Sequence, residues 1–578
     1  MKSRSVQILA ISAALTLTTT LSAIASPSSP ADPEFHKIEF PKVLVNPNDY
    51  PRMTDKEIGH VRHIARLARN PYGDWSGVGT AYLPLQREQM FVISFMALAM
   101  ELAQDELTPA YHEIYQSSIE NLLKKLQHPD VWERWAFESR NGSIEARKGE
   151  PMDWMTNPGW IDPILKDNIQ LKAYILQIAA TYQMLYGDKR YEQPGAFTFK
   201  WKGGMSNGQM NFRYTLTDIV KNTYQEVEDS GYVGSACEPG RVFWICNGPS
   251  NAGFVVYDHL YGTHYGDAGP KMNAKWIKDG YRDPQAYKTV MFVSTSLQDP
   301  SKNVEPRTPQ MDIGGAEEGG WGALYNVAWD YDYTRAQYYA YRDKELDEVV
   351  TGKKFKVEGA RDQSQALAAS FDMANPEEAV GRMCVRSFQV GFFMAYAAEV
   401  GDQQAKDKMF AYADRNFHPV WENGEYYYPR NDDYSVDAQG NVHGVDVWAG
   451  SALIPMARLD RGQGLRKLYS ETWDPARYQQ PFISDVDTLA AGVSQAFFDP
   501  RKDALIVTLL PGPIATKDTS FVVRQLDPTK SYQVIKDGKP VGELSAKHQP
   551  ASTTWRDDGT VLISTSITAA HTFVLVGK

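Results

Sequence analysis

Three helical segments that lie far apart in the chain are expected to end in the same way, which restricts the fold strongly. The endings are Leu185-Tyr186-Gly187-Asp188, Leu260-Tyr261-Gly262-Thr263 and Glu399-Val400-Gly401-Asp402. In each of them a glycine stands where a left-handed residue closes one helix before a second helix begins. About 400 residues of helical hairpins with similar ends fit an (α/α)6 toroid whose helix ends surround a central pocket.

The helical part is predicted to span residues 54–475 and to follow an N-terminal extension at residues 26–53. It opens at Thr54-Asp55-Lys56-Glu57, a capping box in which Thr54 and Glu57 satisfy each other's backbone donors. Apolar residues at helical spacing predict further helices over 86–103, 108–126, 162–186 and 378–400. Long polar inserts, such as 193–213, are expected to be loops over the pocket mouth.

The last part of the chain, residues 484–578, has a different pattern. Short runs of alternating residues are separated by turn signals such as Asp537-Gly538 and Asp558-Gly559. We therefore expect a mainly α protein, an (α/α)6 toroid or barrel followed by a small C-terminal β-sandwich.

Residues 1–25 have the features of a cleavable export signal. Lys2 and Arg4 precede an apolar stretch from Val6 to Leu21, and a small-x-small cleavage pattern follows at Ala23-Ile24-Ala25. No later stretch reaches the roughly 18 apolar residues that a membrane span needs. We expect a secreted or periplasmic protein with no integral membrane span.

Charge argues against nucleic acid as a partner. The formal net charge of the whole chain is -11, and removal of Lys2 and Arg4 with the signal makes it -13 (-11 minus 2). No basic stripe that could follow phosphates is found in the sequence.

Cysteine is scarce, with three residues in the whole chain: Cys237, Cys246 and Cys384. The first two are nine positions apart, and either thiol could serve as nucleophile, acid or base. Cys246 precedes a helix-opening run, where unpaired backbone N–H groups stabilise a thiolate, so it is the better candidate for a lowered pKa. A structural disulfide between the two is the alternative in an exported protein. Their spacing is not a recurring zinc spacing, so no metal site is expected.

Other residues leave two further functions open. Carboxylates in loops could form the acid/base pair of a polysaccharide lyase or glycosidase. Aromatic side chains such as Trp321 and Trp329 suit a sugar-stacking cleft or an apolar pocket for an isoprenoid chain. A non-catalytic ligand-binding protein is the third possibility, and it predicts the disulfide.

The segment 233–265 resembles the linalool dehydratase-isomerase family. The family hallmark is Cys-Glu-Pro, an aromatic-rich stretch, Cys-Asn, and a helix ending in Tyr-Asp-x-Leu-x-Gly-Thr-x-Tyr. Here these elements are Cys237-Glu238-Pro239, Cys246-Asn247 and the run from Tyr257 to Tyr265. Similar blocks at 162–192 and 399–404 extend the resemblance over roughly 67–458, so the chain looks like a divergent, C-terminally extended member.

The resemblance implies a cofactor-independent hydro-lyase or isomerase with an (α/α)6 barrel, which removes water from a small terpenoid allylic alcohol or moves its hydroxyl. Carried over by position, the catalytic residues are Cys237, Cys246, Glu238 and Asp74, with Tyr174 where the family has a histidine. Family pentamers place their sites at subunit contacts, so a homo-oligomer is compatible with the resemblance.

The substrate is expected to be a small apolar alcohol, held by Tyr82, Phe91, Phe243 and Asn247. Phe91 stands where the family has a pocket tyrosine, and Tyr82 is the ring hydroxyl nearest to a second family tyrosine. An apolar pocket would shield an allylic cation from water and raise the pKa of its carboxyl groups toward neutrality.

Overall fold

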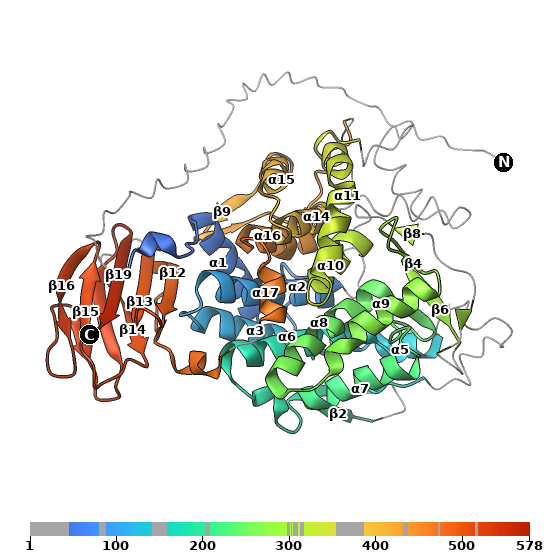
Figure 1. Ribbon diagram of the computed structural model, residues 1–578, viewed down its shortest axis with the longest axis horizontal. Coiled ribbons are helices and arrows are strands. Elements are labelled where there is room, and N and C mark those ends of the chain that lie inside the picture. Colours follow the sequence, from blue (N-terminus) through green and yellow to red (C-terminus); the bar gives the residue numbers. More distant parts are fainter. Residues whose placement is uncertain are drawn as a thin grey trace, which may run out of the picture. The chain divides into compact units, whose positions relative to one another are not determined.

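Helices dominate the chain from Asp55 to Ser470, and strands dominate it from Phe482 to the end (Figure 1). The computed structural model describes residues 45–79, 88–141, 159–202, 208–296, 301, 303–304, 310–311, 317–353, 387–431, 437, 439–471, 474–514 and 518–578. The expected export signal, Tyr82 and Cys384 lie outside these ranges. The described residues belong to one compact unit that runs from Ile38 to Lys578.

The longer helices have the following bounds: α1 (Asp55–Arg69), α2 (Glu88–Leu107), α3 (Glu113–Leu126), α6 (Ile169–Tyr186), α7 (Leu216–Asp229), α8 (Trp244–Tyr261), α9 (Ala268–Lys278), α11 (Tyr331–Val350), α14 (Ser387–Glu399) and α15 (Gln403–Asn416). Shorter ones are α4 (Pro129–Trp132), α5 (Trp135–Asn141), α10 (Gly322–Asn326), α16 (Ile454–Leu459) and α17 (Gly464–Ser470). Two π-helical turns, η4 (Glu317–Trp321) and η5 (Ala449–Leu453), lead into α10 and α16.

The local signals at helix ends are confirmed. The Thr54 hydroxyl accepts a hydrogen bond from the Glu57 amide, and the Glu57 carboxylate accepts one from the Thr54 amide at 2.7 Å. The three glycines expected to close helices are left-handed, with φ of 65° at Gly187, 65° at Gly262 and 77° at Gly401.

Some predicted helix starts are wrong by several residues. The helix expected from residue 162 begins at Ile169, because Asp167 and Asn168 have positive φ angles of 54° and 55° and interrupt the helical backbone. The helix expected from residue 108 begins at Glu113. α14 begins at Ser387, and the whole of the segment 378–386 expected before it is outside the described residues.

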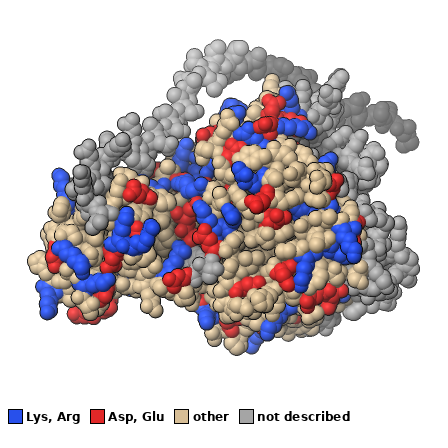
Figure 2. Space-filling view, in the orientation of Figure 1, with Lys and Arg blue, Asp and Glu red and all other residues tan. Residues whose placement is uncertain are grey.

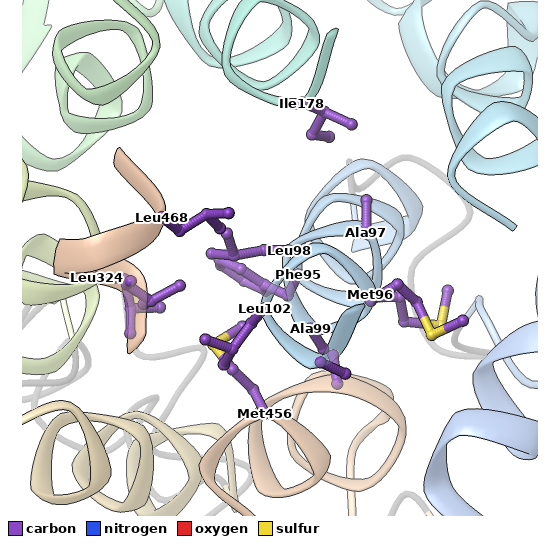
Figure 3. Close-up of a cluster of buried hydrophobic side chains, with 14 of the residues drawn as sticks. Phe95, Met96, Ala97, Leu98, Ala99, Leu102, Ile178, Leu324, Met456 and Leu468 are labelled. Carbon is purple, nitrogen blue, oxygen red and sulfur yellow. The ribbon is translucent and has the colours of Figure 1, made fainter. Parts of the chain in front are cut away.

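Six helices contact one another in a closed cycle. α2 contacts α6, α6 contacts α8, α8 contacts α10, α10 contacts α14, α14 contacts α16, and α16 contacts α2. Figure 3 shows side chains from α6, α10, α16 and α17 directed at α2, among them Ile178, Leu324 and Met456. α6 is buried on all sides from Ile169 to Leu185, so it has no amphipathic stripe.

Other helices pack on the outside of this cycle: α1 and α3 on α2, α7 on α6, α9 on α8, and α11 and α15 on α14. Glycines permit the closest approach within the cycle itself. A Cβ at Gly253 of α8 would lie 2.2 Å from the Leu176 side chain of α6, and one at Gly248 would lie 3.2 Å from Cβ of Tyr325 in α10. Any larger residue at Gly253 would force α8 away from α6.

The helical part also contains small antiparallel sheets. β1 (Phe197–Trp201) pairs with β2 (Met210–Tyr214), β9 (Val420–Glu422) with β10 (Glu425–Tyr427), and β3 (Arg241–Phe243) with β6 (Phe292–Thr295), which also pairs with β7 (Asn303–Val304). A further sheet contains β4 (Arg282–Asp283), β5 (Lys288–Val290) and β8 (Gln310–Met311). The expectation of a plain loop at 193–213 is therefore wrong, because β1 pairs with β2 within it.

The C-terminal region forms two antiparallel sheets. One has the order β11-β14-β18-β17, and the other has the order β12-β13-β19-β15-β16. The strands are β11 (Phe482–Ser484), β12 (Ala491–Asp499), β13 (Ala504–Pro511), β14 (Asp518–Arg524), β15 (Tyr532–Lys536), β16 (Lys539–Leu544), β17 (Thr553–Trp555), β18 (Val561–Ser566) and β19 (His571–Gly577). Phe521 of the first sheet contacts Phe573 of the second at 5.4 Å between ring centroids, so the two sheets share a core.

Backbone hydrogen bonds join these sheets to the helical part. The Met53 amide donates to the Ser494 carbonyl at 2.8 Å, and the Ala110 amide donates to the Ala496 carbonyl at 3.0 Å. Within the described part of the chain, none of the helices combines the length and apolarity needed to cross a bilayer.

Candidate active site

A tight turn presents Cys237 at the start of a hairpin. Glu238-Pro239-Gly240-Arg241 forms the turn, in which the Arg241 amide donates to the Glu238 carbonyl at 2.8 Å and Gly240 has φ of 76°. Proline in the second position and a left-handed glycine in the third are the residues that a type II turn requires. The Cys237 amide donates to the Arg241 carbonyl at 2.8 Å, which fixes the cysteine beside β3.

Cys246 lies in the first turn of α8, which begins at Trp244. This confirms the expectation that it stands at a helix amino terminus, where the helix dipole favours a negative charge. Cys237 is 3% exposed and Cys246 is 2% exposed. Both are thiols and not the two halves of a disulfide, so the predicted alternative of a structural bridge is wrong.

Asn247 connects the segment before Cys237 to the start of α8. Its amide nitrogen donates to the carbonyls of Ser235 at 3.0 Å and Phe243 at 2.9 Å, and its amide oxygen accepts from the Ser235 amide at 2.9 Å. The side chain is fully buried and committed to backbone groups. We therefore assign Asn247 to holding the two cysteine segments together, in place of the expected contact with substrate.

Tyr174 of α6 lies beside both cysteines. It is 1% exposed, and burial raises the pKa of its hydroxyl well above the ordinary value, with further contributions from Tyr325, Cys246 and Cys237. The Trp321 side chain lowers the pKa of this hydroxyl, but by less than burial raises it. The hydroxyl of Tyr174 thus stays protonated at neutral pH and can donate a hydrogen bond near the thiols.

An aromatic cluster adjoins the Tyr174 ring. Phe91 of α2 is partly buried, and its ring centroid is 6.1 Å from that of Tyr174, 5.2 Å from that of Trp321 and 4.6 Å from that of Trp448. Trp321 stacks on Phe392 of α14 at 5.4 Å. The predicted residues Phe91 and Tyr174 are therefore brought together, in apolar surroundings.

Two polar oxygen atoms, one on a ring next to Tyr174 and the other on the residue after Cys237, are buried without a hydrogen-bond partner in the described part of the chain. The Tyr325 hydroxyl is one, although Tyr174 is close enough to lower its pKa against the raising effects of burial and Glu101. Oε2 of Glu238 is the other. Buried polar groups of native proteins are rarely left unbonded, so such groups are typical of a site that binds a ligand or water.

Asp74 is in a different environment from the one expected. Its carboxylate accepts a hydrogen bond from the Ser76 amide at 2.9 Å in a solvent-accessible turn after α1, and this bond, with Lys125 nearby, lowers the pKa of the carboxyl. The expectation that burial would raise this pKa is wrong. Among the described residues, no contact joins Asp74 to the cysteines or to Tyr174.

Of the two remaining predicted site residues, the structure describes Phe243 but not Tyr82. Phe243 precedes α8, and its ring packs on Phe292 across the β3–β6 pair at 4.9 Å. Tyr82 lies outside the described residues. No cluster of three or more His, Cys, Asp and Glu side chains suited to a metal ion occurs in the part of the chain that the structure describes.

Several residues of the site carried little signal in the sequence. Phe392 of α14 and Tyr325 of α10 lie in apolar helices, and Trp448 directly precedes η5. Nothing in their spacing separates these residues from ordinary core residues. Trp321 stands in a Gly-Gly-Trp-Gly run, and both it and Trp448 adjoin a π-helical turn. π-helical turns are frequent at functional sites, but hydrophobic periodicity does not predict them.

Fold and site together define a mainly helical protein with a thiol site enclosed by helices and aromatic rings. The family model for linalool dehydratase/isomerase matches residues 90–434, which is more than half of the 578-residue chain. The protein belongs to this family, as the resemblance at the cysteine motif predicted. Membership implies an enzyme of the dehydratase/isomerase kind.

Proposed function

We propose that the protein is an exported, cofactor-independent hydro-lyase or isomerase that acts on an allylic alcohol of terpenoid type through Cys237 and Cys246. The observation that carries the proposal is the shared burial of both thiols beside the Tyr174 hydroxyl. The family match supports the reaction class. The charged n-region and apolar stretch of residues 1–25 support export.

The proposal includes an (α/α)6 toroid as the scaffold. The closed cycle from α2 through α6, α8, α10, α14 and α16 supports it, as do the helices that pack outside that cycle. In such a scaffold the helix ends around the axis supply a pocket, and Cys246 is at the amino end of α8.

Removal of water from an allylic alcohol requires one proton to be given and one to be taken. An acid protonates the hydroxyl, the C–O bond breaks with its electron pair on the departing water, and a base takes a proton from a neighbouring carbon. Tyr174 is suited to hold the substrate oxygen, since its hydroxyl remains protonated. The thiol of Cys237 and the thiolate form of Cys246, favoured at the amino end of α8, are then the acid and the base.

The aromatic cluster suits the cation that forms when the C–O bond breaks. Phe91, Trp321 and Trp448 meet edge to face or tilted, so the cluster presents ring faces as well as edges. An aromatic face attracts a cation with about 0.5–2 kcal/mol, and apolar walls keep water from capturing it.

The two alternative functions have less support. A ligand-binding protein was expected to bridge its cysteines, which are thiols here. A lyase that cleaves anionic polysaccharides needs a basic cleft to bind them, whereas the face in Figure 2 has Lys and Arg interspersed with Asp and Glu.

Replacement of each thiol tests the proposal. We expect Cys237→Ser and Cys246→Ser each to lower turnover of an allylic terpenoid alcohol by about 10²- to 10⁴-fold, because a hydroxyl is a poorer proton donor and acceptor here than a thiol. Product formation would be followed by gas chromatography, with circular dichroism as the folding control. Full turnover by both folded variants would disprove the assignment.

A further inference from the structure

A buried carboxyl group that the proposed chemistry does not use lies in the middle of α2. Glu101 is 0% exposed, and its Oε2 accepts a hydrogen bond from the Gln177 amide of α6 at 2.9 Å. Its Oε1 is buried and has no hydrogen-bond partner in the described part of the chain. Burial raises the pKa of this carboxyl well above its ordinary value, more than the Gln177 bond lowers it, so the group is a neutral acid inside the protein.

Three tyrosines on three different helices have hydroxyl groups on which the charge of Glu101 acts: Tyr186 of α6, Tyr325 of α10 and Tyr469 of α17. The pKa of each hydroxyl is raised well above its ordinary value by burial first and then by neighbours that include Glu101. Each hydroxyl oxygen is buried without a hydrogen-bond partner among the described residues. No charged side chain contributes to the raised pKa of Glu101 itself.

Glu101 stands between the thiol site and a pocket at the opposite ends of α2 and α6. Phe95 of α2 meets Tyr174 of α6 at 6.0 Å, beside the thiols. One or two turns along, Glu101 bonds Gln177. At the far ends of the same helices, Asp105 and Tyr186 line a pocket of about 550 Å³ that Phe482 and Phe498 of the C-terminal sheets complete.

The order of these contacts makes α2 and α6 parallel neighbours. It also places polar groups along the path from the pocket to the thiol site. At the helical rise, Glu101 is roughly 9 Å from Phe95 and roughly 6 Å from Asp105 along the axis. From the pocket inward, the sequence of groups is Tyr186, Glu101, Tyr325 and Tyr174. A water molecule that bonds to two buried polar oxygens carries a proton between groups that do not bond each other directly.

We propose that Glu101 is a proton-relay residue that connects the thiol site, through Tyr325 and Tyr174, with the pocket between the helices and the C-terminal sheets. The inference rests on the proposed function, because the dehydration reaction is what requires protons to move along this path. After each dehydration the acid thiol lacks one proton and the base thiol carries one more, while the substrate has lost the elements of water. The relay moves one proton from the base toward Glu101 and returns one to the acid, so the enzyme is restored with no net gain or loss.

Thiol hydrogen exchange tests the relay without requiring turnover. The S–H stretching band of the native protein would be followed by infrared spectroscopy after transfer into D₂O. We expect Glu101→Gln, which keeps the shape and the Gln177 contact but removes the acidic proton, to slow S–H exchange about tenfold or more. Tyr325→Phe is also expected to slow S–H exchange. It serves as the test of the relay if E101Q does not fold.

Glu106→Gln is the matched control on the same helix. Glu106 is a partly buried carboxyl whose pKa is raised to about 7, but it accepts from the Arg461 amide at 3.0 Å and pairs with Lys467 at 3.6 Å, and it is not among the neighbours that raise the pKa values of the three tyrosines. We expect E106Q to leave S–H exchange unchanged. Equal exchange rates in E101Q, Y325F and wild type would overturn the relay.

Turnover measurements separate this proposal from the function on which it rests. If allylic alcohols are substrates, E101Q is expected to lower kcat about tenfold with little change in KM, because Glu101 does not touch the substrate. If the wild type converts no such alcohol, the proposed function fails, while the exchange rates still confirm or overturn the relay.

Discussion

Buried polar groups are treated differently in the two regions of the molecule. In the C-terminal sheets nearly all of them are bonded, with the Thr519 hydroxyl as the exception among the described residues. The Thr508 hydroxyl bonds both Gln495 at 3.0 Å and Thr572 at 2.9 Å, and the Gln495 amide donates to the Pro47 carbonyl. In the helical core, Glu101 Oε1 and the Tyr325 hydroxyl have no such partner among the described residues.

The difference indicates where stability and function lie. A bonded polar pair in a core contributes to one rigid arrangement, whereas an unbonded one costs stability and persists where a ligand or proton uses it. The C-terminal sheets thus have a structural role, and the centre of the helical region has the chemical one. Four predictions test this division.

The largest effect is expected from the core of the C-terminal sheets. Phe521→Ala removes a fully buried ring that packs on Phe573, and we expect it to lower the free energy of unfolding by about 3–5 kcal/mol. Urea denaturation measures the change, with Val541→Ala on an exposed position of β16 as control. The kcat of folded F521A should equal that of the wild type, and a large loss of kcat would contradict a structural role.

Tyr174→Phe is expected to have the opposite effect, a loss of turnover without a loss of stability. It keeps the ring that contacts Phe91 but removes the hydroxyl beside the thiols, so turnover should fall about 10²-fold while the melting temperature stays or rises. Tyr182→Phe on the same helix is the control, because its hydroxyl bonds Gln116 and Glu120 at the outer side. Unchanged turnover in Y174F would remove the tyrosine from the site.

A smaller effect is expected in the pH dependence of stability. The pKa of Glu101 is raised on folding, so its contribution is fully present below the ordinary value of 4.5 and is lost as pH rises above it. Glu101→Gln does not titrate. We therefore expect the melting temperature of E101Q, relative to that of the wild type, to increase as pH increases from 4.5 to 7. A constant difference over this range would show that Glu101 is not a buried acid.

The smallest effect is expected at Asp74. Its pKa is lowered in the folded protein, so the small stabilisation is present at neutral pH and is lost as pH falls through the folded value. Because this carboxylate lies in a solvent-accessible turn, Asp74→Asn should keep turnover within about twofold of wild type.

A loss of turnover in D74N as large as that in Y174F would contradict this expectation. It would mean that a second copy of the chain brings Asp74 to the thiols. Mixing D74N with Cys246→Ser subunits would then restore activity, since each variant would supply the residue that the other lacks.

The parts of the fold that follow from neighbouring residues could be predicted. The capping box at Thr54, the glycine closures at Gly187 and Gly262, and the hairpin turn at Asp537-Gly538 depend on backbone preferences within a few positions. The start of α6 could not, because Asp167 and Asn168 adopt a left-handed backbone that neither residue type requires. The π-helical turns beside Trp321 and Trp448 likewise had no clear pattern.

The cysteine motif shows the same limit within the site. Pro239 and Gly240 dictate the turn after Cys237, whereas α8 opens at Trp244, before Cys246 and not after it as the sequence indicated. The commitment of Asn247 to the Ser235 backbone, and the exposure of Asp74, depend on which segments pack together.

By itself the sequence determined the helical and strand regions, the hairpin ends and the reaction class implied by its two cysteines. The tertiary structure decided which groups meet: Tyr174 with the thiols, Phe91 with two tryptophans, and Glu101 with three tyrosines. The physical reason is that caps and turns are set by local backbone energies, whereas burial, and with it the charge state of a side chain, is set by helices distant in the chain.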